Sequence, residues 1–186
     1  MRVLLLLLIL VVAWLLLSGL KCEPVVGGRD TTYAVILVCK MPIQVQEMRK
    51  KYIKHDNLPP HVTLGYLAPD FNAKDVMDKL RHFKDKTIRF NHLKITTPFI
   101  ALIPSDTSEL NNLARSLGDD LQAGPRGGYH LSLAYRERGE PLAPATAMFA
   151  QKEIEDKIPI EAKVSEIRIS KKRPGENWIK FKSVQF

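Results

Sequence analysis

The sequence is poor in cysteine and in the residue arrangements that usually hold a metal ion. Its 186 residues include two cysteines and five histidines. No CxxC pair, no HExxH segment and no cluster of cysteine with histidine occurs anywhere in it. We therefore expect chemistry without a metal or another cofactor, in which side chains themselves move any protons.

The two cysteines leave the redox environment of the chain open. Cys22 lies in a linker and Cys39 at the end of an expected strand, so an oxidising compartment would allow them to form a disulfide. Alternatively, Cys39 is a small buried hydrophobic residue and Cys22 an incidental surface thiol.

Acidic residues are fewer than basic ones. The chain has 20 Asp and Glu against 28 Lys and Arg, which gives a formal net charge of +8. A basic surface favours polyanionic partners such as RNA, nucleotides or acidic lipid headgroups, although many basic proteins bind none of these. A chain of this length with 45% hydrophobic residues can bury the core of one ordinary domain.

Long apolar runs are missing except at the N-terminus. Arg2 precedes an uninterrupted apolar stretch over residues 3–17. This stretch predicts a signal peptide or an uncleaved signal anchor over residues 1–20. The protein would then enter the secretory pathway and be secreted, or be held at a membrane through residues 3–20.

The remainder of the chain reads as a linker over residues 21–31 and one domain over residues 32–186. Apolar periodicity and turn residues predict the order β-α-β-α-β-β-α-β-α-β-β, which fits two related α+β lobes. The expected strands are 33–38, 61–67, 87–96, 99–103, 129–135, 158–170 and 178–186, and the expected helices are 41–52, 73–83, 106–121 and 144–156.

One short pattern occurs twice in the expected strands. It reads histidine, apolar, hydroxyl, apolar, and the copies are 69 residues apart. Chance predicts about 0.4 His-x-(Ser/Thr) patterns in this chain, and roughly 0.1 with apolar residues at both remaining positions. The two copies are His61-Val62-Thr63-Leu64 and His130-Leu131-Ser132-Leu133.

This pattern suits the cleavage of a phosphodiester. Alternate residues of a strand share a face, so each copy offers one imidazole and one hydroxyl to the same side. One imidazole can take a proton from the attacking hydroxyl or water while the other gives a proton to the leaving oxygen. We therefore predict that His61 and His130 are catalytic, in roles that depend on the side of the leaving group, and that Thr63 and Ser132 bind the phosphate.

The paired pattern resembles the signature of the two-histidine phosphoesterase superfamily. That superfamily includes the LigT-like RNA ligases and cyclic phosphodiesterases, viral phosphodiesterases that degrade 2′,5′-oligoadenylate, and eukaryotic RNA-end trimming enzymes. The resemblance in element order runs from about Thr32 to Phe186. It implies a bilobal α+β fold made of a duplicated unit, with a cleft between two related sheet-and-helix lobes, and a reaction that needs no metal.

Other residues near the two motifs are candidates for weaker roles. The basic face of the first helix, with Arg49, Lys50 and Lys51, is more often solvated but could border a phosphate cleft. His82 and His92 lack a hydroxyl at the right offset and are expected to be structural or surface residues. The glycine-rich stretch before the second motif is expected to be a turn rather than a phosphate loop. Possible substrate contacts are Tyr66, Tyr129, Tyr135, Arg126 and Arg136.

The sequence thus predicts a metal-independent phosphodiesterase, expected to be a monomer. Its substrates would be RNA ends, 2′,5′-linked oligonucleotides, 2′,3′-cyclic phosphates or cyclic nucleotides. One alternative is an RNA- or nucleotide-binding module that keeps the fold, does not turn over and is tethered to a membrane. Another is a membrane-tethered interaction domain with incidental histidines, which would leave the duplicated pattern unexplained.

Overall fold

A computed structural model describes residues 31–52, 58–96, 99–135 and 144–185 of the chain. The expected signal peptide or anchor, residues 21–30 of the expected linker (with Cys22) and Arg136 lie outside these residues. Among the helices that are described, none is long and apolar enough to span a membrane.

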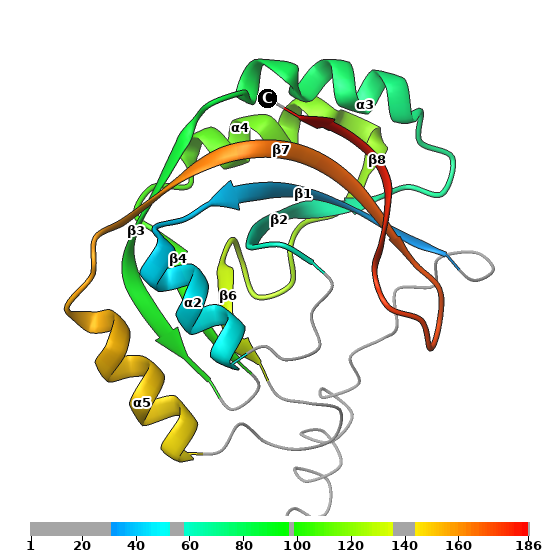
Figure 1. The fold of residues 1–186 in the computed structure, drawn as a ribbon. Helices are drawn as coiled ribbons and strands as arrows, with labels where there is room; N and C mark the ends of the chain where they lie inside the picture. The colour runs from blue at the N-terminus through cyan, green and yellow to red at the C-terminus, as the bar shows by residue number, and fades with distance from the viewer. Residues whose placement is uncertain (1–30, 53–57, 97–98, 136–143, 186) are drawn as a thin grey trace, which may run out of the picture.

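The helices and strands follow the predicted order, with one strand added (Figure 1). Short 3-10 turns follow α3 and α4. The elements are β1 (Thr32–Lys40), α2 (Ile43–Tyr52), β2 (His61–Leu67), α3 (Ala73–Leu80), β3 (Thr87–Ile95), β4 (Phe99–Pro104), α4 (Ser108–Leu117), β5 (Leu121–Ala123), β6 (Leu131–Tyr135), α5 (Pro144–Glu155), β7 (Ile160–Lys172) and β8 (Ile179–Gln185).

In the part of the chain that the structure describes, all strand pairs are antiparallel, and they form one connected network of eight strands. The path runs β1-β2-β6-β4-β3-β7-β8, and β5 pairs with β2. The first residues of β7 pair with β3 and the later ones with β1, so the path also closes from β7 back to β1. The expected α+β fold is confirmed, with its strands joined in one network rather than in two separate sheets.

Strand β1 explains how this network is buried on both faces. Val35 and Leu37 belong to the main core, and both are fully buried. Ala34 and Ile36 point to the opposite face and belong to a second, smaller cluster against which Trp178 packs. The continuous apolar run of this strand is what burial on both faces requires.

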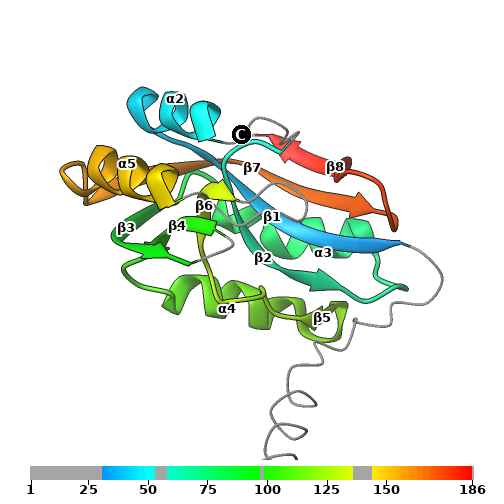
Figure 2. The same ribbon diagram turned by 90° about the horizontal axis from the view of Figure 1, so that it is seen from below.

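Two helices, α3 and α4, lie together above the arch formed by β7 and β1 (Figures 1 and 2). The Asn72 side chain caps α3 by accepting hydrogen bonds from the backbone N–H groups of Lys74 and Asp75. Each helix buries one apolar stripe in the main core, as its periodicity predicted. The stripes are Val76, Met77 and Leu80 in α3, and Leu110, Leu113 and Leu117 in α4.

The prediction for α4 was wrong at both ends. The helix begins at Ser108, and Asp106 instead accepts a hydrogen bond of 2.8 Å from the Ser108 backbone N–H. It ends at Leu117 because Gly118 adopts a positive φ of 57°, which L side chains rarely adopt. Residues 121–123, expected to end the helix and begin a loop, form β5 on the edge of β2.

The other helix pair, α2 and α5, is joined by an ion pair of 2.7 Å between Lys51 and Glu153. Lys50 and Lys51 are exposed, as a solvated basic face predicts. Cys39, at the end of β1, is a buried free thiol whose Sγ donates to the Leu37 carbonyl oxygen. Burial of Cys39 confirms its interpretation as a small buried residue, and it raises the pKa of the thiol to about 12.

Candidate active site

The two histidine motifs lie on neighbouring antiparallel strands. Val62 of β2 pairs directly with Leu131 of β6, and both side chains are fully buried. Residues on either side of this pair must therefore point to the opposite face. In an antiparallel pair the residue before Val62 lies opposite the residue after Leu131. The residue after Val62 likewise lies opposite the residue before Leu131.

This register gathers the four predicted polar side chains on one face. Continued one residue in each direction, this register would set His61 across from Ser132 and Thr63 across from His130, which is the residue just before β6 begins. Directly opposite residues have Cβ atoms about 4.5–5.5 Å apart. In that register each histidine would lie next to the hydroxyl of the other motif, at a spacing that suits a single phosphate group.

Both imidazoles are held in the same way. Nδ1 of His61 lies 2.8 Å from the Pro59 carbonyl oxygen, and Nδ1 of His130 lies 2.8 Å from the Gly128 carbonyl oxygen. A carbonyl oxygen only accepts hydrogen bonds, so Nδ1 carries the proton in both rings. Nε2 is then the ring atom that can accept or release a proton.

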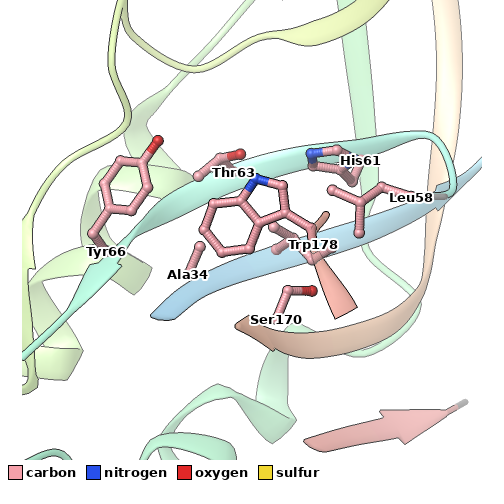
Figure 3. Close-up of a pocket in the computed structure, with 8 residues that line it drawn as sticks. Ala34, Leu58, His61, Thr63, Tyr66, Ser170 and Trp178 are labelled. Atoms are coloured by element: carbon pink, nitrogen blue, oxygen red, sulfur yellow. The ribbon is translucent and has the colours of Figure 1, made fainter. Parts of the chain in front are cut away.

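The surroundings of the two rings differ. His61 is half-buried and lines a pocket of about 60 Å³ where β1, β2, β7 and the start of β8 meet (Figure 3). His130 instead stacks against Phe99 of β4, with ring centroids 5.1 Å apart and planes 12° from parallel. The pocket is lined by Ala34, Ile36, Leu58, His61, Thr63, Tyr66, Ser170 and Trp178.

Arg49 connects the two motif segments, a role that the sequence did not predict. It was assigned to a basic face that is more often solvated, yet it is only 8% exposed. Its Nε donates to the Ser132 carbonyl oxygen at 3.1 Å, and its Nη1 donates to the Leu58 carbonyl oxygen at 3.3 Å. Arg49 therefore ties the second motif strand to the segment that leads into the first.

Tyr66 and Arg126 lie on the pocket side of the molecule. The Tyr66 ring lines the pocket beside Thr63. The Arg126 guanidinium lies 5.9 Å from the centre of that ring, within the range of a cation–π contact. The segment before the second motif thus approaches the first motif.

Tyr129 is directed elsewhere. Its hydroxyl donates to the Leu110 carbonyl oxygen of α4 at 3.3 Å, and its ring packs against the main core. Desolvation raises the pKa of Tyr129. It is a packing residue rather than a part of the pocket, whereas Tyr135 ends β6 opposite Phe99.

The segment before His130 is a hydrogen-bonded turn, which confirms the preferred interpretation. Gly127 and Gly128 have positive φ angles of 75° and 83°, and the Gly128 N–H donates to the Pro125 carbonyl oxygen at 3.1 Å. His82 and His92 are exposed, as expected. Within the described ranges, no three His, Cys, Asp or Glu side chains gather in a group that could hold a metal ion.

Several solved structures are similar to this chain at low sequence identity. The structure of E. coli LigT complexed with NADP+ is 12% identical with a TM-score of 0.44, and the match covers 84% of this chain and 97% of LigT. A phosphoesterase crystal structure is 14% identical with the same TM-score, and the match covers 86% of this chain and 99% of the other. A third match, at 12% identity with a TM-score of 0.41, is E. coli LigT complexed with 3′-AMP, and it covers 86% of this chain and 99% of LigT.

A search of curated proteins finds no match to the chain. The family model described as the 2′-5′ RNA ligase superfamily matches residues 39–176, a range that covers most of the chain and contains both histidine motifs. This match confirms the resemblance to the LigT-like two-histidine phosphoesterases, and the chain belongs to the 2′-5′ RNA ligase superfamily.

Proposed function

We propose that this protein is a metal-independent phosphodiesterase that acts on RNA-type phosphodiesters. The observation that carries the proposal is the pairing of Val62 with Leu131, a register that supports two imidazoles and two hydroxyls on one face. Family membership supports a phosphoesterase reaction, because it rests on a range that includes both motifs. His61 and His130 are the proposed acid and base, and Thr63 and Ser132 the proposed phosphate ligands.

The proposed reaction begins with the phosphate held by the hydroxyls of Thr63 and Ser132. Both donate hydrogen bonds to non-bridging oxygens, where negative charge accumulates in the transition state. One imidazole, with Nε2 unprotonated, takes the proton of the attacking oxygen as the new P–O bond forms. The other, protonated at Nε2, gives its proton to the leaving oxygen as the old P–O bond breaks.

Two versions of the reaction need the same pair of histidines. In one, a ribose hydroxyl attacks the adjacent phosphate and gives a 2′,3′-cyclic product. In the other, water opens such a ring. The histidine that acts as the base when the cyclic phosphate forms would act as the acid when the ring opens by the reverse path. The same pair of histidines can therefore catalyse both ring formation and ring opening.

We also propose that the two motif units are related copies facing a shared cleft. In each unit a helix precedes the histidine segment, although β5 lies between α4 and the second one. In each, the histidine Nδ1 lies 2.8 Å from the carbonyl oxygen two residues earlier. The same offset and the same distance in both copies support a duplicated unit.

A turnover assay tests the proposed function. The protein would be incubated with a nucleoside 2′,3′-cyclic phosphate and, separately, with a 2′,5′-linked dinucleotide, and the products would be separated by chromatography. We expect turnover of at least one substrate, and its loss in the double variant His61→Ala, His130→Ala. Saturable binding of both substrates without any product would instead identify a binding module, and undiminished activity of the double variant would place the site elsewhere.

A further inference from the structure

A row of residues crosses four strands on the face that carries His61. Ala34 of β1 pairs with Tyr66 of β2 on one side and with Ser170 of β7 on the other. Ser170 in turn pairs with Lys180 of β8. Tyr66, Ala34 and Ser170 all line the same pocket as His61 and Thr63.

Ser170 is the unusual member of this row. Its side chain is fully buried, and its Oγ has no hydrogen-bond partner among the described residues. An unsatisfied buried hydroxyl loses its hydrogen bonds to water without compensation, which costs free energy in the folded state. Its neighbours in the pocket, Ala34 and Ile36, are apolar and offer no partner. A ligand atom or a water molecule in the pocket could supply the missing hydrogen bond.

Trp178 supplies a flat apolar wall above this hydroxyl (Figure 3). Its indole packs against the cluster formed by Ala34, Ile36 and Val38 and remains half-buried. Leu58 and the Tyr66 ring complete the apolar lining. An aromatic wall with one buried polar atom fits a planar ring that carries hydrogen-bonding groups on its edge.

We propose that this pocket is a nucleobase subsite, in which Trp178 stacks on the base and the Ser170 hydroxyl hydrogen-bonds to its edge. The inference rests on the proposed function and deepens it. The base of a nucleotide lies one sugar away from its phosphate, and the pocket adjoins the phosphate site through His61 and Thr63. The substrate class is therefore a nucleotide whose base is bound on the His61 side.

The kinetic test compares substrates with and without a base. Nucleoside 2′,3′-cyclic phosphates would be assayed beside methyl riboside 2,3-cyclic phosphate, which has the ring phosphate but no base. Trp178→Ala should raise KM for the nucleotides roughly 5- to 100-fold, as expected for loss of base stacking, and change kcat little. It should leave the kinetics of the base-free substrate within about twofold of wild type.

Matched variants separate stacking from folding. Trp178→Phe keeps an aromatic wall and should raise KM for nucleotides by less than about fivefold. Phe181→Ala removes a 45% exposed ring that is not part of the pocket lining, and it should not change KM. Ser170→Ala should alter the ranking of the four bases by roughly three- to tenfold, because a buried hydrogen bond to one edge is lost.

Two outcomes overturn the subsite while leaving the phosphodiesterase intact. One is an equal rise of KM for the base-free substrate in Trp178→Ala, which would assign the indole a structural role. The other is unchanged base ranking in Ser170→Ala together with unchanged KM in Trp178→Ala, which would leave the hydroxyl to a water molecule.

A binding test keeps the subsite testable if no substrate turns over. The chain has two tryptophans, Trp14 and Trp178, so Trp14→Phe in the full chain leaves Trp178 as the sole indole. Adenosine and uridine 3′-monophosphates should quench its fluorescence saturably, whereas ribose 5-phosphate should not. Quenching without turnover would reject the proposed function and retain the subsite, and absence of quenching by either nucleotide would reject the subsite.

Discussion

The two histidine motifs are held alike at the ring but differ in their surroundings. In each, Nδ1 lies 2.8 Å from the carbonyl oxygen two residues earlier. His61 begins a strand that pairs with β1, β5 and β6, and it lines a pocket. His130 follows a glycine turn and stacks on Phe99 outside that pocket lining.

The two motifs share the hydrogen bond at Nδ1 and differ in the residues that surround each ring. The shared hydrogen bond fixes the tautomer, which both an acid and a base need in order to present Nε2. The unequal surroundings would give the proposed active site a direction, because His61, unlike His130, lines the pocket that Tyr66 and Trp178 border. We infer that the motifs contribute equally to proton transfer and unequally to substrate recognition.

The largest effects should come from the histidines themselves. His61→Ala and His130→Ala should each lower kcat roughly 100- to 10,000-fold, because each removes one proton-transfer group. The double variant should lose less than the product of the two, since acid and base act as a unit. Steady-state assays would measure this, with His92→Ala, an exposed histidine in β3, as the control. A single variant that retains wild-type kcat would contradict equal participation.

Removing either motif hydroxyl should lower activity less than removing either histidine. Thr63→Val and Ser132→Ala should each lower kcat/KM by about 10- to 100-fold, because each removes one donor to the phosphate oxygens. Neither substitution removes a proton-transfer group, so both variants should retain the pH dependence of wild type. A change confined to KM would show that the hydroxyl binds ground state and transition state equally.

Substituting Arg49 should affect both motifs, because its side chain contacts the strand of one and the segment that leads into the other. Arg49→Met removes the hydrogen bonds to the Ser132 and Leu58 carbonyl oxygens and should lower kcat about tenfold. It should also lower the free energy of unfolding by about 1.5–3 kcal/mol, the range for hydrogen bonds to a charged group. Urea unfolding and steady-state kinetics would test this, with the exposed Lys50→Met as control. Full activity in Arg49→Met would show that the strands hold their own register.

Gly65 lies in β2, so substituting it perturbs the strand of the first motif and not that of the second. A Cβ at this position would lie 2.7 Å from the Ala123 carbonyl oxygen and 2.6 Å from a Leu121 methyl group, so Gly65→Ala should displace β5. We expect a loss of about 1–3 kcal/mol in the free energy of unfolding, as for overpacked sites. Gly124→Ala is the matched control, since a Cβ there meets nothing within 4 Å. Equal urea midpoints for the two variants would refute the close contact.

The features found from sequence are those encoded locally. The period-2 pattern of each motif predicts its strand, although β6 begins one residue after His130, and the apolar stripes predict α3 and α4. The burial of Arg49 could not be predicted because it depends on the approach of α2 to β6, two elements far apart in the chain. The three residues of β5 are too few to show a period. The positions of Ser170 and Trp178 in the pocket could not be predicted, because they depend on the pairing of β7 with β1.

The dependence of the rate on pH tests the two-histidine account most directly. The rate on a 2′,3′-cyclic or 2′,5′-linked substrate should rise with pH as the base loses its proton, then fall as the acid loses its own. We predict a bell-shaped profile that excess EDTA leaves unchanged, with the residual activities of His61→Ala and His130→Ala each lacking one limb. Loss of activity on chelation, restored by a divalent ion, would contradict the account and replace it with a metal-dependent mechanism.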